Sequence, residues 1–147
     1  MAFYQSDIGK RLASAPIVTE AGQLKTARFS FSFAAGFVAA SDKLELGELP
    51  AGAMIVDAIL VPQNMNGNAT VGLMSGEVGV ADAARTVGSE LWSAQAVAST
   101  PVRLAALTGW TIAIDKDNRR SIGVTLSADV TGAANKTLDL YLTYTMP

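Results

Sequence analysis

The sequence contains no cysteine and no histidine. Without cysteine, the chain can form no disulfide and can bind no metal through a thiolate. Without histidine, it lacks the side chain that most often serves as a general base and as a ligand of transition metals. Its acidic residues also show no pattern typical of two paired catalytic carboxylates. We therefore predict that the protein is not an enzyme and carries no cofactor and no metal.

Charge is scarce as well, since charged residues make up 16% of the chain, against about 25% in an average soluble domain. The net charge is −2 and no basic cluster is present, which argues against nucleic acid as a partner. No segment approaches the ~20 apolar residues that span a bilayer, and the N-terminus does not resemble a secretory signal. We expect no membrane partner and synthesis in the cytoplasm.

Half of the residues are apolar. Few polar side chains therefore remain to cover the surface of a monomer. Large exposed apolar areas usually mark interaction sites, so we expect part of the surface to be buried against other copies of the chain or against a scaffold. A monomer with many small exposed alanines is the alternative.

Residues 54–61 lie between the turn signal Leu-Pro-Ala-Gly at 49–52 and Pro62. A run of eight residues, rich in β-branched side chains and bounded by proline and glycine, predicts a strand. Strict alternation would place Ile55, Asp57 and Ile59 on one face. We expect a central strand that is covered on both faces, or one whose second face meets another subunit.

The rest of the chain is organised as short segments of alternating polarity separated by turns. Asn66-Gly67 predicts a hairpin between 54–61 and 69–74, and 121–128 and 137–146 are expected to form another. Within the irregular insertion 75–99, residues 89–98 predict a short helix that brings Trp92 to the sheet. The remaining strands are predicted at 24–33, 43–46, 102–105 and 110–114. About eight strands and one short helix predict an all-β fold, an antiparallel β-sandwich with a jelly-roll-like arrangement over residues 24–147.

Residues 1–23 show no sustained period and predict an extended N-terminal arm. Exposed aromatic side chains are costly to leave in water, which favours an arm docked on a partner over a frayed terminus. The candidate interface residues of the arm and of the body are Phe3, Tyr4, Ile8, Lys10, Arg11, Ile55, Asp57, Ile59 and Trp92.

Two other features of the sequence bear on ligand binding. Residues 115–118, Asp-Lys-Asp-Asn, begin like a calcium loop, but Arg119, Arg120 and Leu126 stand where a ligand, a glycine and a glutamate are needed. This predicts a solvated turn. Trp92 and Trp110 could line a sugar site, although lone tryptophans are more often core or interface anchors.

The order of several segments resembles that of a known family. These segments are Leu-Pro-Ala-Gly-Ala at 49–53, Ile-Val-Asp-Ala at 55–58, Ala-Thr-Val-Gly-Leu at 69–73 and Leu-Asp-Leu-Tyr-Leu-Thr-Tyr at 138–144. Together they resemble head decoration (capsid cement) proteins of tailed bacteriophages. The resemblance implies a β-sandwich, often a homotrimer, that binds the major capsid protein on the outer surface of the virion and stabilises the shell. Another virion part, such as a tail or head-fibre protein, and a carbohydrate-binding module are the alternatives.

Overall fold

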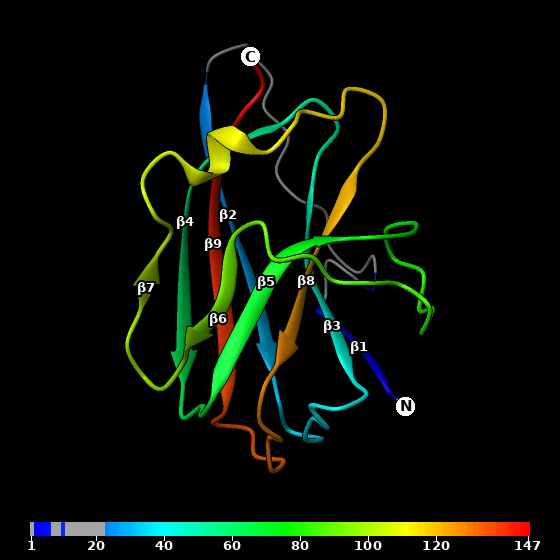
Figure 1. Cartoon of the computed structure of the whole chain (residues 1–147), viewed down its shortest axis with the longest axis vertical. Helices are drawn as coiled ribbons and strands as arrows, with labels where there is room; N and C mark the ends of the chain where they lie inside the picture. Colours follow the sequence, from blue (N-terminus) through cyan, green and yellow to red (C-terminus); the bar gives the residue numbers. More distant parts are fainter. Residues whose placement is uncertain (1, 7–9, 11–22) are drawn as a thin grey trace.

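The computed structural model describes residues 2–6, 10 and 23–147, which form two facing β-sheets (Figure 1). Sheet A has the strand order β1-β3-β8-β5-β6, and sheet B has the order β2-β9-β4-β7. Helical structure in the described residues is confined to the 3-10 turn η1 (Thr108–Thr111), and none of it could cross a membrane. The strands are β1 (Phe3–Gln5), β2 (Leu24–Ser32), β3 (Lys43–Leu49), β4 (Met54–Gln63), β5 (Asn68–Met74), β6 (Trp92–Ala96), β7 (Val102–Arg103), β8 (Arg120–Leu126) and β9 (Thr137–Thr145).

Among strands β2 to β9, the first pairs with the last, the second with the second-to-last, and so on. β2 pairs with β9, β3 with β8, β4 with β7 and β5 with β6, all antiparallel. This is the pairing of one long hairpin rolled into two four-stranded sheets, which is a jelly roll. β1 adds to the edge of sheet A through a parallel pairing with β3. The predicted all-β, jelly-roll-like sandwich is confirmed.

Both predicted hairpins are wrong. β4 lies in sheet B and β5 in sheet A, so Asn66-Gly67 carries the chain from one sheet to the other. β8 and β9 are separated between the two sheets in the same way. An alternating strand buries the same apolar face whether the next strand lies beside it or opposite it. A turn sequence such as Asn66-Gly67 predicts that the chain reverses direction, but it does not predict whether the next strand joins the same sheet or the opposite one.

Two local predictions in the second half of the chain are also wrong. The helix predicted at 89–98 is replaced by β6, which pairs antiparallel with β5 across an irregular register. The strand predicted at 110–114 is replaced by η1 and the loop that follows. In the first case, pairing with β5 provides hydrogen-bond partners for the backbone of residues whose sequence is also compatible with a short helix. The tertiary pairing overrides this weak local preference.

The core lies between the inner faces of the sheets and includes Leu138, Leu140, Leu142 and Tyr144 of β9. β9, between β2 and β4, forms the middle of sheet B, while β4 is bordered on its other side by the two-residue strand β7. The register of β4 shifts between Ile55 and Asp57. This bulge breaks strict alternation and turns Ile55 inward, away from the face that carries Asp57. The predicted grouping of these two side chains on one face is therefore wrong.

Burial gives Tyr144 a testable pH dependence. Burial, followed by the negative charge of Glu48, raises the pKa of the Tyr144 phenol from 10.0 to about 12. The unfolded chain then loses this proton before the folded chain does, so the free energy of unfolding should fall as pH rises from 10.0 towards about 12. Urea titrations over this range should show a shallower decline for Tyr144→Phe than for the wild type. Equal declines in the two proteins would contradict the assignment.

Candidate interaction surface

The outer face of sheet A is covered by the connection between β5 and β6. This connection, residues 75–91, is tied to β5 by Gly88 N–H, which donates to Leu73 O at 2.9 Å, and by Leu91 N–H, which donates to Val71 O at 3.0 Å. Across the sheet, Lys43 Nζ of β3 donates to Ala83 O at 2.9 Å. The connection therefore lies over the sheet and removes that face as a broad contact surface.

A buried ion pair holds this cover in place. Arg85 is 3% exposed and Glu45 of β3 is 0% exposed, and their charged atoms lie 3.1 Å apart. Glu45 also accepts hydrogen bonds from Ser121 Oγ at 2.5 Å, Gln5 Nε2 at 2.6 Å and Gly79 N–H at 2.9 Å. Buried charges are tolerated when each is paired and hydrogen-bonded. The cluster fixes the covering segment to β3 and β8.

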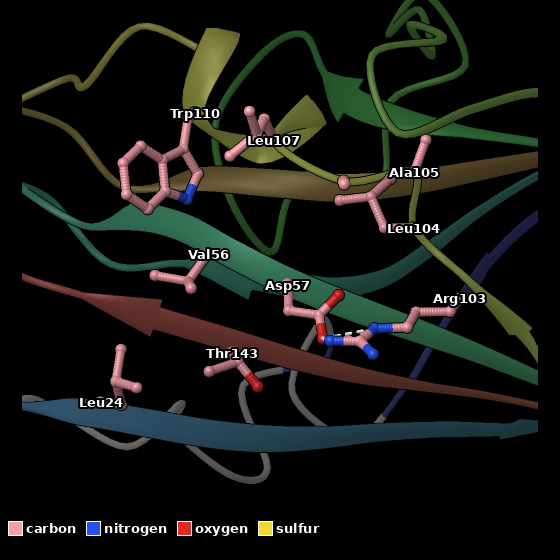
Figure 2. A pocket seen from close by; sticks show the side chains of 10 residues that line it. Leu24, Val56, Asp57, Arg103, Leu104, Ala105, Leu107, Trp110 and Thr143 are labelled. Carbon is pink, nitrogen blue, oxygen red and sulfur yellow. Dashed lines mark hydrogen bonds and ion pairs between the residues drawn. The ribbon is translucent and has the colours of Figure 1, made fainter.

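The outer face of sheet B is open among the described residues, and a groove of about 610 Å³ runs along it (Figure 2). Strands β2, β4 and β9 supply one side of the groove, and the segment from Arg103 to Trp110 supplies the other. Its lining is mostly apolar and consists of Leu24, Val56, Asp57, Arg103, Leu104, Ala105, Ala106, Leu107, Trp110 and Thr143.

Three large apolar side chains that line the groove are exposed. Leu107 is 66% exposed, Leu24 is 61% exposed and Trp110 is 57% exposed. Leu107 has a φ of 66°, in the left-handed region, which costs a residue with a Cβ about 1–2 kcal/mol. Close packing holds this turn, because a Cβ at Gly109 would lie 2.6 Å from the carbonyl oxygen of Ile55. The fold thus holds Leu107 in an exposed position with a strained backbone, a combination that is common at functional surfaces.

Ion pairs border the apolar groove. Arg103 Nη2 lies 2.8 Å from Asp57 Oδ2 (Figure 2), and Arg28 Nη2 lies 2.7 Å from Asp139 Oδ2 further along the sheet. The hydrogen bond and charge of the partner carboxylate raise the pKa of each arginine above its usual value. Within the described ranges, no three acidic residues gather closely enough to hold a metal ion. The face therefore combines a mostly apolar groove with ion-paired side chains.

The structure separates the predicted interface residues. Asp57 lines the groove and Ile59, 37% exposed, lies on the same open face of sheet B. Ile55 and Trp92 are 1% and 6% exposed and belong to the chain's own core. They are turned inward by the β4 bulge and by the pairing of β6. Trp92 and Trp110 therefore form no shared platform.

The predicted arm residues are divided in a different way. Phe3 and Tyr4 are half-buried in β1, and Lys10 is exposed. Ile8 and Arg11 lie outside the described residues. The groove also contains Leu24, Arg103 and Leu107, which the sequence did not predict as interface residues. For Leu107 no signal was present, because no short-range pattern distinguishes an exposed apolar residue of a loop from a buried one.

No protein-family model and no curated protein sequence matches the chain. Among solved structures, a chain in the capsid of Ralstonia phage GP4 is 37% identical, with a TM-score of 0.90 and coverage of 99% of both chains. A chain of the cyanophage Pam1 capsid asymmetric unit is 19% identical, with a TM-score of 0.59 and coverage of 92% of this chain and 93% of that chain. A chain of the acid-stable capsid of Helicobacter pylori bacteriophage KHP30 is 13% identical, with a TM-score of 0.55 and coverage of 87% and 91%.

The last two similarities show a shared fold. The first extends over the whole chain at an identity that shows common descent. It also agrees with the expectation, drawn from the missing histidine and cysteine, that the protein is not an enzyme. The chain belongs to the family of bacteriophage capsid proteins found in the capsid of Ralstonia phage GP4, and its role is structural, within the virion.

Proposed function

We propose that the protein is a decoration, or cement, protein that binds the outer surface of the phage head and bridges subunits of the major capsid protein. The observation that carries this proposal is the open face of sheet B, where Leu107 and Trp110 stand exposed beside an apolar groove. Since the cover of residues 75–91 occupies the outer face of sheet A, sheet B offers the larger open face among the described residues.

The composition of the groove suits a protein partner. Tryptophan and arginine are enriched among the residues that dominate binding energy at interfaces, and here Trp110 and Arg103 line the same groove. The Asp57–Arg103 pair would form part of a polar rim around an apolar centre. Each copy needs to bind only modestly, because many copies joined to one another act together on a shell. A homotrimer, which the resemblance implies, would present three such grooves.

Trp110→Ala tests this surface. We expect the variant to bind heads that lack the protein at least about tenfold more weakly than the wild type, because it truncates the largest exposed apolar side chain at the groove. Binding is measured by co-sedimentation with purified heads over a range of protein concentrations. Thermal unfolding should remain unchanged, since the indole is mostly exposed in the free chain.

Val38→Ala is the matched control, because Val38 is 50% exposed and lies outside the groove. This variant should bind heads like the wild type. Equal binding by Trp110→Ala and Val38→Ala would contradict the proposed surface. Mass spectrometry of purified heads and purified tails addresses the location separately, since recovery in tails alone would assign the chain to a tail or fibre part.

A further inference from the structure

The N-terminal strand β1 is an accessory to the jelly roll. The eight strands β2 to β9 complete both sheets by their own pairings, and β1 pairs with β3 through three residue pairs, Phe3–Lys43, Tyr4–Leu44 and Gln5–Glu45. Figure 1 shows β1 at the edge of sheet A, beside β3. This geometry is that of an extended peptide added to the edge of a sheet.

The receptor for this peptide is built from side chains of the jelly roll. Two buried acidic residues, Asp42 and Glu45, accept hydrogen bonds from this peptide. Ala2 N–H donates to Asp42 Oδ1 at 2.8 Å, and Gln5 Nε2 donates to Glu45 Oε2 at 2.6 Å. Ser6 N–H then donates to Glu45 O at 3.0 Å. The site therefore recognises both the backbone and the side chains of residues 2–6.

Aromatic side chains complete the receptor. The ring of Tyr4 lies 5.9 Å from that of Phe31 and 5.6 Å from that of Phe37. The guanidinium of Arg85 lies 5.7 Å from the centre of the Phe3 ring. Contacts of this kind add to the free energy of burial, so a segment as short as β1 has a specific and energetically significant binding site.

The chain between the peptide and β2 is long. Sixteen residues, 7–22, separate Ser6 from Gln23, and a chain of that length can span at most about 55 Å. A domain of this size has a radius of gyration of about 15 Å. The connection is therefore long enough for β1 to reach the β3 edge of an adjacent copy as well as that of its own body.

We propose that the β3 edge is a strand receptor, and that in the assembled protein β1 of one copy fills the receptor of a neighbouring copy. Exchange of an identical element needs no contacts beyond those already made within one chain. It links copies through residues 2–6 and leaves the groove of sheet B free. The proposal goes beyond the decoration function and can be tested in solution without a phage head.

Two single-cysteine variants, Phe3→Cys and Lys43→Cys, provide the test. These positions are opposite in register, neighbouring strands lie about 4.8 Å apart, and this spacing suits a disulfide. The natural chain has no cysteine to interfere. The two variants are refolded together at assembling concentrations, oxidised mildly and examined by mass spectrometry for a disulfide that joins one chain of each kind.

Exchange predicts a mixed disulfide dimer containing Cys at position 3 of one variant and at position 43 of the other. Absence of that dimer, while the double variant closes its disulfide within a single chain, would overturn the proposal. Phe3→Cys mixed with Ala134→Cys is the control, because Ala134 is exposed in the turn before β9, and it should give no specific pair. If either variant of the first pair does not fold, Ala2→Cys and Ser41→Cys, joined by a bismaleimide, test the same prediction.

Discussion

Replacing Arg85 with alanine should lower the free energy of unfolding by about 3–5 kcal/mol, the range for removing one partner of a buried ion pair. Glu45 is 0% exposed, so without Arg85 its charge would remain buried, and its hydrogen-bond donors among the described residues, Ser121, Gln5 and Gly79, are neutral. Arg85 also holds the covering segment by donating from Nε to Ser75 O at 2.5 Å and from Nη1 to Val80 O at 2.9 Å. Urea unfolding followed by circular dichroism measures the loss.

Arg103→Ala is the matched control, because its ion pair with Asp57 is exposed on the arginine side and exposed pairs contribute little to stability. It should unfold close to the wild type. Changing Arg85 and Glu45 together to methionine should recover much of the loss, since no unpaired charge is left buried. A loss for Arg85→Ala no larger than that for Arg103→Ala would contradict the role assigned to the buried pair.

Gly47→Ala should destabilise the protein by about 2–3 kcal/mol, near the upper end of the usual cost of overpacking a core. A Cβ at Gly47 would lie 2.4 Å from the Phe29 ring, which is closer than any normal contact. Gly47 lies on β3 at a register shift and Phe29 on β2, so this contact joins sheet A to sheet B. The free energy of unfolding, from urea titration, provides the measurement.

The double variant Gly47→Ala/Phe29→Leu separates this contact from other effects of the alanine. Leucine lacks the ring that the new methyl group would strike, so the double variant should be more stable than the sum of the two single losses predicts. Strictly additive losses would show that the Gly47 contact with the ring is not the source of the destabilisation.

The two sheets differ in whether their outer faces are covered. Sheet A uses its outer face internally, because the segment 75–91 and the Glu45–Arg85 pair close it. Sheet B has an exposed tryptophan and leucine beside a groove. Under the proposed function, sheet B contacts the shell, and under the proposed strand exchange, the edge of sheet A at β3 joins neighbouring copies. The two sets of variants test these surfaces independently.

Several features were determined by the sequence alone. The alternation of Leu138, Leu140, Leu142 and Tyr144 with polar residues predicts β9 almost to the residue, and the phenylalanines at 29, 31 and 33 predict β2 equally well. Period two identifies a strand with one buried face. The absence of histidine and cysteine argued against an enzyme, while the structural role in a virion was predicted from the resemblance of several segments to phage decoration proteins.

Other features depended on the tertiary structure. A bulge of one residue moved Ile55 into the core, Trp110 became exposed while Trp92 was buried, and Glu45 met Arg85 from 40 residues away. Alternation specifies which side of a strand is buried, but not which strand it faces or where an extra residue shifts the register. Partner choice is decided by the packing of the two sheets against each other, and only that packing shows which side chains remain for contact with other molecules.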